Sequence, residues 1–398
     1  MKRVLIWDKN IRLSNTGGPS GYLYNLHEYL LNKPNEQIQF YSDIISKGKD
    51  KMETVRKHTS GLLSLLNKSK KIGFILEACH LYFRNFVLTE EDRAIINRFD
   101  FVHIHSINDM LSSFCQGGIR PLTILTTHTP EPFFDEMVSR YGYTKVFKAL
   151  PFIRSFFIKR ECFAYKEADY IMLPVKEAAE VYTSNSILLK ETFERACNKF
   201  FYVPTSLFPE HSIGQNQHQL DRYDIPTEAI VLCFIGRHNK VKGYESLKEI
   251  ANEVWKHLPN VYFVIGGKEE PLTGLKDKRW IELGWVKTPD LLQEVDAFIL
   301  PNQQTYFDII LLEVLREGKM AIIASTGGNK WFAKHPIEGI WNYDFNDANA
   351  VVKICQIIAE IKKENRVESV NEGVKDFCVS CFSAEQFVNS YIKEIEKL

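Results

Sequence analysis

The sequence predicts an α/β protein of two Rossmann-like domains with mostly parallel sheets. Short apolar runs rich in Val, Ile and Phe alternate with amphipathic stretches of ten or more residues, which is typical of parallel strands joined by crossover helices. The 398 residues suffice for two domains of ordinary size. A polar, turn-rich segment over 206–227 separates two series of such runs. We therefore predict a linker there, and two domains that face one another across a cleft.

Each series is expected to form one sheet. The predicted strands of the first series are 4–7, 39–42, 101–105, 123–127, 170–174 and 199–203. Those of the second series are 230–235, 261–265, 280–283, 297–300, 320–324 and 339–341. The predicted domains cover 1–206 and 207–383, and a C-terminal helix over 384–398 can pack back on the N-terminal domain. Doubly wound sheets bind ligands at the carboxyl ends of their strands, so we look for chemistry there.

Charge and composition limit the class of protein. Lys plus Arg and Asp plus Glu both number 50, so the formal net charge is zero. This balance argues against a protein that binds nucleic acid over its whole surface, and we predict no nucleic-acid partner. The segment 1–8 is too short for a signal peptide, and no apolar run approaches the length of a membrane-spanning helix. Eight scattered cysteines indicate reduced thiols in a cytoplasmic chain.

Two cations follow the strand predicted over 230–235. Gly236 and Arg237 follow that strand directly, and Lys242 and Gly243 close a short loop before the next helix. An arginine offers a planar fork of donors, a lysine offers a point charge, and a glycine allows close backbone approach. This combination suits a diphosphate. The alternative is that both cations are solvated loop residues.

A second group of residues follows the strand predicted over 297–300 and Pro301. The loop 302–308 leads into an apolar helix over 309–317, which ends at Gly318, a natural C-terminal cap. Helix amino ends attract phosphate through unpaired N–H groups and the helix dipole. Glu313, one turn inside, can accept two ribose hydroxyls. The alternative is a surface glutamate favourably placed near a helix amino end.

Six motifs in the second half share an order and spacing with a known family. They are Gly236-Arg237 with Lys242-Gly243, Gly266-Gly267, Leu283-Gly284-Trp285-Val286, Asp296-Ala-Phe-Ile-Leu-Pro301, Leu312-Glu313-Val-Leu-Arg-Glu-Gly318 and Ser325-Thr-Gly327-Gly328. Landmarks of the first half are Thr16-Gly17-Gly18, the strand 101–105, Thr127-His128-Thr129 and Ala168-Asp169-Tyr170. The chain thus resembles the GT-B-fold group 1 (GT4) glycosyltransferases, strongly over 225–398 and weakly before it.

The resemblance implies a retaining, metal-independent hexosyltransferase without a cofactor, which moves a sugar from a nucleoside-diphosphate sugar to a glycan or lipid-linked acceptor in bacterial surface polysaccharide biosynthesis. The first domain would bind the acceptor and the second the donor. Arg237 and Lys242 would hold the diphosphate and neutralise the leaving group in place of a metal, His128 would lie near the sugar, and Glu313 would bind the ribose. The other implied donor-binding residues are Gly17, Gly18, Gly236, Trp285, Val286, Thr305, Tyr306, Phe307 and Ile309.

The loop before the apolar helix departs from the family pattern. Thr305 stands where the first glutamate of the E-x7-E motif is expected, and Tyr306, Phe307 and Asp308 replace a glycine-rich turn. A threonine donates one hydrogen bond but supplies no carboxylate. Asp308 is a candidate helix N-cap that would also bring negative charge near the diphosphate. These changes favour, as the alternative function, a catalytically silent GT-B subunit that binds a glycan or a partner enzyme. A nucleotide-sugar epimerase of the same fold would require acidic residues at the sugar.

His128 follows the strand pattern 123–127 and precedes a proline turn. A lone histidine in such a position is often structural, but the strand end and the family match favour a function. We predict that His103 and His105, which alternate on one strand, are structural.

Two segments of the first half are basic and apolar. Residues 145–160 carry five cations and no acid among interleaved phenylalanines, and 56–84 adds lysines around a group of leucines. Such surfaces dock on anionic membranes, so we predict a peripheral position on the inner face of the plasma membrane. The alternative is a pair of ordinary helices whose apolar sides face the core.

Overall fold

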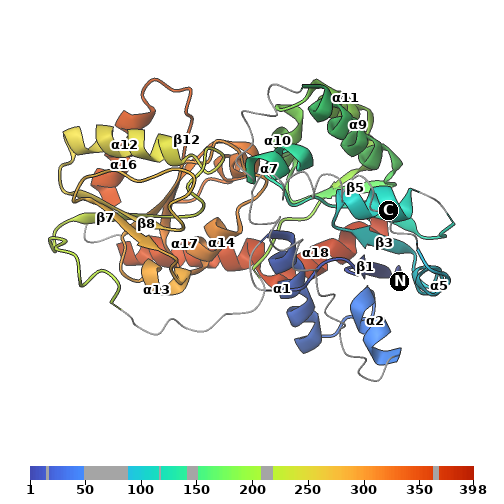
Figure 1. Cartoon of the computed structure of the whole chain (residues 1–398). Helices are drawn as coiled ribbons and strands as arrows, with labels where there is room; N and C mark the ends of the chain where they lie inside the picture. The colour runs from blue at the N-terminus through green and yellow to red at the C-terminus, as the bar shows by residue number, and fades with distance from the viewer. Residues whose placement is uncertain (15–17, 49–87, 116–117, 141–150, 208–217, 362–366) are drawn as a thin grey trace, which may run out of the picture. The chain divides into compact units, whose positions relative to one another are not determined.

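The computed structural model describes residues 1–14, 18–48, 88–115, 118–140, 151–207, 218–361 and 367–398 (Figure 1). They form two compact units. Unit 1 consists of Met1–Leu173, Tyr182–Val203 and Ser390–Leu398, and unit 2 consists of Pro174–Val181 and Pro204–Asn389. Gly17 and the basic segment 56–84 lie outside the described residues. The predicted domain limits, the cleft and the facing of the two domains stay predictions.

Unit 1 contains a six-stranded sheet in which every pairing is parallel, in the order β2-β1-β3-β4-β5-β6. Its strands are β1 Val4–Trp7, β2 Ile38–Phe40, β3 Phe101–Ile104, β4 Leu122–Leu125, β5 Tyr170–Leu173 and β6 Phe200–Tyr202. Its helices include α1 Gly18–Asn32, α2 Tyr41–Gly48, α5 Glu90–Ile96, α6 Ile107–Asp109, α7 Phe133–Arg140, α9 Pro151–Glu167 and α11 Ile187–Arg195, and α10 Glu180–Thr183 lies at the boundary with unit 2.

The strands of unit 1 occur where the sequence predicted them, but β2 to β6 end one or two residues before the predicted ends. The strand predicted over 39–42 stops at Phe40, and Tyr41 begins α2 instead. The reason is a hydrogen bond of 3.0 Å from the backbone N–H of Ser42 to Oδ1 of Asp8, which draws the chain away from the sheet. All four residues of β1 and of β3 are buried, as expected for parallel strands covered on both faces.

Unit 2 contains the second six-stranded parallel sheet, in the order β12-β11-β10-β7-β8-β9. Its strands are β7 Ile230–Ile235, β8 Val261–Gly266, β9 Trp280–Gly284, β10 Ala297–Leu300, β11 Met320–Ala324 and β12 Ile340–Tyr343. Its helices include α12 Tyr244–His257, α13 Thr288–Leu292, α14 Ile309–Arg316, α15 Lys330–Lys334, α16 Ala350–Ile361 and α17 Val367–Phe382. This is the doubly wound order, and it reverses between β7 and β10.

Helices cover both faces of the second sheet. Side chains of α12 and α16, among them Leu247 and Ile358, form one buried cluster with alternate strand residues such as Phe234, Phe263 and Ile299. Figure 1 shows α13, α14 and α17 along the opposite side of this sheet. Because helices cover both faces of the sheet, each strand is a continuous apolar run and does not alternate between apolar and polar residues.

The last helix, α18 Ala384–Lys397, begins in unit 2 and ends in unit 1. Within unit 1, the hydroxyl of Tyr391 lies 2.8 Å from Nδ1 of His103. The Glu396 carboxylate accepts hydrogen bonds from the Lys2 backbone N–H at 3.0 Å and from Nε2 of Gln37 at 2.8 Å. In the part of the chain that the structure describes, no helix combines the length and apolar character required to cross a bilayer.

Candidate functional site

The strongest candidate site lies in unit 2, where the strand order reverses. β7 and β10 are parallel neighbours, with Ala297 beside Leu232 and Phe298 beside Cys233. Their carboxyl ends therefore open side by side, and the segments that follow them start at Gly236 and at Pro301. Parallel doubly wound sheets bind ligands at this switch point, because no crossover helix covers it.

The two loops that follow these strands approach each other closely at a glycine. Gly243, the residue before α12, has φ of +69°, and a Cβ atom there would lie 1.6 Å from the carbonyl oxygen of Pro301. The Val241 carbonyl accepts a hydrogen bond of 2.9 Å from the backbone N–H of Gln303. The loop after β7 and the loop after β10 thus contact each other directly through their backbones.

The loop after β10 also approaches the turn that follows β11 closely. A Cβ atom on Gly327 would lie 1.9 Å from the Thr305 carbonyl oxygen, and one on Gly328 would lie 2.2 Å from that of Tyr306. The Gly328 N–H donates to the Thr305 carbonyl at 3.1 Å. The predicted motif 325–328 therefore allows the Thr305 loop to lie against the turn that follows β11.

Lys242 reaches the switch point with a counter-ion. Its Nζ forms an ion pair with Oδ1 of Asp308, and the two side chains are only 16% and 11% exposed. Oδ2 of Asp308 accepts a hydrogen bond of 2.8 Å from the Thr305 hydroxyl and another from Nδ2 of Asn302. Asp308 occupies the N-cap position of α14, but its carboxylate makes no capping hydrogen bond. The predicted N-cap position is thus confirmed, but the predicted capping hydrogen bond does not form, because side-chain donors occupy these oxygens.

The other predicted donor residues of unit 2 differ in exposure. Arg237 is exposed directly after β7, and Trp285 is 88% exposed after β9. Val286 packs against Gly266, since a Cβ on that glycine would lie 2.6 Å from Cγ2 of Val286. In contrast, Tyr306 and Phe307 are buried and Ile309 is half-buried.

Glu313 projects from the second turn of α14. Burial raises the pKa of its carboxyl group, while a hydrogen bond from the Thr288 hydroxyl and the nearby Arg316 act in the opposite direction. Thr288 begins α13, just beyond the exposed Trp285. The structure thus brings Glu313 next to the segment that follows β9, and its ribose role stays a prediction.

A buried network behind Arg237 was not predicted. The ring of His238 is fully buried and stacks on Tyr244 with 4.1 Å between ring centroids. The Glu282 carboxylate accepts hydrogen bonds from the Tyr244 hydroxyl and, at 2.7 Å, from Nε1 of Trp280. Burial lowers the pKa of His238 and raises that of Glu282, so it favours the neutral form of both. The sequence signal was the position of His238, next to Arg237 at a strand end.

His128 lies in unit 1, in the segment between β4 and α7. The Thr127 hydroxyl lies 3.0 Å from the hydroxyl of Tyr165 and 2.7 Å from that of Tyr182. The Tyr182 hydroxyl also donates to the Thr129 carbonyl at 3.3 Å. Buried tyrosines of α9 and α10 thus hold the backbone on both sides of His128.

His128 is part of a histidine cluster. Its Nε2 lies 3.0 Å from Nδ1 of His105, whose ring is tilted against that of His103 with 4.1 Å between centroids. Tyr22 packs on His128 at 4.6 Å. Burial lowers the pKa of His103 and of His128 to about 3, and that of His105 well below its usual value. All three rings are therefore neutral at pH 7, and His105, which we predicted to be structural, contacts the candidate residue directly.

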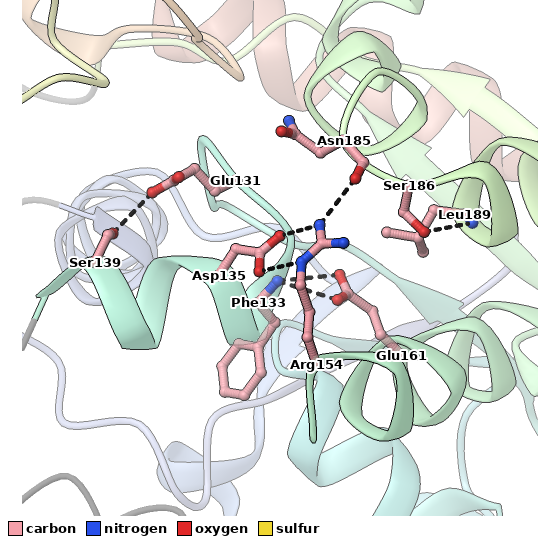
Figure 2. A network of polar contacts seen from close by, with 9 residues as sticks. All are labelled: Glu131, Phe133, Asp135, Ser139, Arg154, Glu161, Asn185, Ser186 and Leu189. Carbon is pink, nitrogen blue, oxygen red and sulfur yellow. Dashed lines mark hydrogen bonds and ion pairs between the residues drawn. The ribbon is translucent and has the colours of Figure 1, made fainter. Parts of the chain in front are cut away.

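A polar network fixes the helix that follows the His128 segment (Figure 2). Arg154 of α9 donates from Nε and Nη2 to the Asp135 carboxylate of α7, at 2.8 and 2.6 Å, and to the Asn185 carbonyl at 2.8 Å. The Glu161 carboxylate accepts the backbone N–H of Phe133 at 3.1 Å, at the amino end of α7. Burial raises the pKa of Glu161 to about 8.

Glu161→Gln is expected to stabilise the chain increasingly as the pH rises. The folded protein retains the Glu161 proton up to about pH 8, whereas the unfolded chain loses it near 4.5. The wild type therefore loses stability as pH rises through this interval, by at most about 1.4 kcal/mol per pH unit. Urea unfolding at pH 5 to 8 should show the smallest difference at pH 5 and roughly 2 to 4 kcal/mol at pH 8.

The control for this measurement is Glu167→Gln, an exposed carboxylate on the same helix, which should leave the pH dependence unchanged. A constant difference between Glu161→Gln and wild type across the range would contradict the raised pKa.

One group of metal-ligand type occurs among the described residues. It comprises His218, Asp221 and Glu294, of which the first two are exposed. The Glu294 carboxylate already accepts backbone hydrogen bonds from Gln219 at 2.8 Å and Leu220 at 2.9 Å. None of these residues belongs to the predicted site.

Comparison with protein families gives a match in the second half of the chain. Residues 229–360 match the model of the glycosyl transferases group 1. The matched range lies within unit 2 and runs from β7 into α16, so it contains Arg237, Lys242 and Glu313.

Two relatives match most of the chain. UDP-Gal:alpha-D-GlcNAc-diphosphoundecaprenol alpha-1,3-galactosyltransferase of Escherichia coli is 23% identical over 367 residues, which are 85% of this chain and 86% of that protein. An uncharacterized 41.2 kDa protein in the cps region of Klebsiella pneumoniae is 22% identical over 316 residues, 75% of this chain and 78% of that protein.

Solved structures resemble the whole chain. Sucrose-phosphate synthase from Thermosynechococcus elongatus aligns over the full length of both chains with a TM-score of 0.60 at 13% identity. HepE of Anabaena, solved in complex with UDP-glucose, aligns over the full length of both chains at 0.58 and 12%. The lipopolysaccharide outer core galactosyltransferase WaaB also aligns over both full lengths, at 0.55 and 15%. These likenesses confirm the predicted GT-B fold.

Proposed function

Since the chain is a group 1 glycosyltransferase of the GT-B fold, we propose that it moves a hexose, with retention, from a UDP-sugar to a lipid-linked or glycan acceptor in bacterial surface polysaccharide assembly. The observation that carries this proposal is the convergence of Arg237, Lys242 and the amino end of α14 at the switch point of unit 2. The E. coli relative, which by its name uses UDP-Gal and a diphosphoundecaprenol-linked acceptor, supports the choice of both substrates.

The proposed chemistry is neutralisation of the departing diphosphate. The bond between the anomeric carbon and the phosphate oxygen breaks, and its electron pair leaves on the diphosphate. Arg237 supplies a planar fork of donors for that charge, and the N–H groups at the start of α14 add a partial positive charge. Fixed positive groups of this kind need no reorganisation during the reaction. The acceptor hydroxyl attacks from the face on which the diphosphate departs and gives its proton to the departing phosphate oxygen, and we assign no side chain as nucleophile.

A thermal-shift series tests the donor proposal. UDP, UDP-galactose and UDP-glucose should raise the melting temperature, because a ligand that binds only the folded state stabilises it. GDP-mannose serves as the comparison, and each titration is repeated with EDTA. No shift with any uridine nucleotide would remove the proposal, and a shift lost with EDTA would remove its metal independence.

We also propose that α9 contacts an anionic membrane. Phe152, Phe156 and Phe163 are 68%, 42% and 47% exposed. The exposed Lys159 and Lys166 lie three or four positions from the nearest of these phenylalanines along the helix. Residues three or four apart lie on one helix face, so apolar and basic side chains form one exposed stripe. Of the predicted membrane segment, 145–150 lies outside the described residues and Arg154 is bound to Asp135.

Vesicle co-sedimentation measures this contact. The wild type should bind vesicles that contain anionic lipid and release them as salt increases, since each cation near the surface contributes about 1 kcal/mol. The double variant Phe152→Ser, Phe156→Ser should bind several-fold more weakly. Ile187→Ser, which changes an exposed apolar residue on α11, is the matched control. Equal binding of the wild type to neutral vesicles would contradict the proposal.

The catalytically silent subunit is the second candidate. The pairing of Lys242 with Asp308 favours it, together with the threonine at 305. Such a subunit would bind UDP-sugars but would release no UDP from them. It would neither hydrolyse the donor nor transfer the sugar to an acceptor lipid. UDP release that requires Arg237 would rule it out.

A further inference from the structure

Asp308 has three side-chain partners at the switch point. Its Oδ1 holds the Lys242 ammonium, and its Oδ2 accepts hydrogen bonds from Thr305 and Asn302. It leaves the N–H groups of α14 without a capping carboxylate. The four side chains come from the loops after β7 and β10, whose backbones contact at Gly243 and Pro301. The arrangement is therefore built into the junction of the two loops.

This arrangement places a negative charge where the proposed function requires a diphosphate. The Lys242 and Asp308 side chains are 16% and 11% exposed, so solvent and salt screen their charges less than those of a surface pair. A diphosphate that draws on the Lys242 ammonium must share it with Asp308 and is repelled by the same carboxylate. The free-energy cost of binding therefore grows with the negative charge of the ligand.

The charge of the ligand rises during the proposed reaction. In a UDP-sugar the terminal phosphate is esterified and carries one charge. After transfer its oxygen is free, with a second pKa near 6, so UDP carries nearly one further negative charge at pH 7. A nearby carboxylate therefore opposes UDP more strongly than it opposes the UDP-sugar.

We propose that Asp308 is an internal counter-ion of Lys242 that weakens the binding of the nucleotide product relative to the donor and so promotes product release. The inference rests on the proposed donor function. It makes Asp308 a positioning residue that acts through Lys242, without contact to the reacting sugar carbon.

Calorimetric titration of Asp308→Asn with UDP and UDP-glucose tests the inference. Asparagine has the shape of aspartate and still accepts a hydrogen bond from Thr305, but it lacks the charge. We expect UDP to bind roughly tenfold more tightly than to the wild type and UDP-glucose to gain less. The matched control is Glu317→Gln, which removes one exposed charge at the opposite end of α14 and should change neither affinity. Unchanged or weaker binding of UDP to Asp308→Asn, or an equal gain for both ligands, overturns the inference.

Lysine acetylation read by mass spectrometry provides a second measurement without a nucleotide. In the ligand-free protein, Lys242 should react several-fold faster in Asp308→Asn than in the wild type, with the exposed Lys240 as internal reference. Equal reactivity of Lys242 in the two proteins shows that Asp308 does not hold it and overturns the inference. If the wild type binds neither UDP nor UDP-glucose, the proposed donor function fails, and acetylation still decides whether the counter-ion exists.

Discussion

Arg237→Ala is expected to abolish UDP release from the donor and to leave the fold intact. The side chain is exposed at the end of β7, so its loss opens no cavity in the core. In the proposed reaction it supplies a planar fork of donors for the charge of the departing diphosphate. Loss of one preorganised donor for developing charge typically costs about 10²–10³ in rate, and a charged fork is at the upper end of that range. A coupled assay of UDP release measures the effect.

Two further variants sharpen this experiment. Lys240→Ala removes an exposed cation from the same loop and should retain most of the activity. Arg237→Lys keeps the charge but loses the bidentate geometry, so an intermediate rate is expected. Full activity of Arg237→Ala, with a melting temperature equal to the wild type, would refute its assignment to the diphosphate.

Gly243→Ala is expected to unfold the junction of the two loops at the switch point. The new Cβ would meet the Pro301 carbonyl oxygen at 1.6 Å, and φ of +69° is unfavourable for alanine. The left-handed conformation costs about 1–2 kcal/mol, and overpacking adds typically 1–3 kcal/mol. We expect a loss of roughly 2–5 kcal/mol in the free energy of unfolding of unit 2 and of detectable UDP binding. Chemical denaturation and calorimetry measure the two effects.

Gly373→Ala is the matched control, because it makes the same substitution in the same unit. A Cβ on Gly373 in α17 would meet no atom within 4 Å, and alanine favours a helix interior over glycine by about 1 kcal/mol. This variant should be as stable as the wild type or slightly more so. A Gly243→Ala protein with unchanged stability would show that the two loops do not need the observed approach.

The strands could be predicted where burial imposes an uninterrupted apolar run. β7, β10 and β11 begin and end at the predicted residues, since parallel strands covered on both faces carry few polar residues. The end of β2 could not be predicted, because Tyr41 continues the apolar run while a hydrogen bond to Asp8 turns the backbone away. That bond joins residues 34 positions apart.

The positions of the cations were predictable, but their partners were not. A strand followed by a glycine and a short loop places Arg237 and Lys242 at a sheet edge by local rules alone. The Lys242–Asp308 pair, by contrast, joins residues 66 positions apart and depends on the pairing of β7 with β10. In the same way, the contact of His105 with His128 depends on the pairing of β3 with β4.

The sequence by itself determined the α/β class, nearly all the strands and the sheet edge at which the charged residues stand, because apolar periodicity and turn chemistry act over a few neighbouring residues. Only the tertiary structure decided which charges are already neutralised. Ion pairs and buried hydrogen bonds form between segments that strand order brings together, and that order reverses at the point where Lys242 meets Asp308.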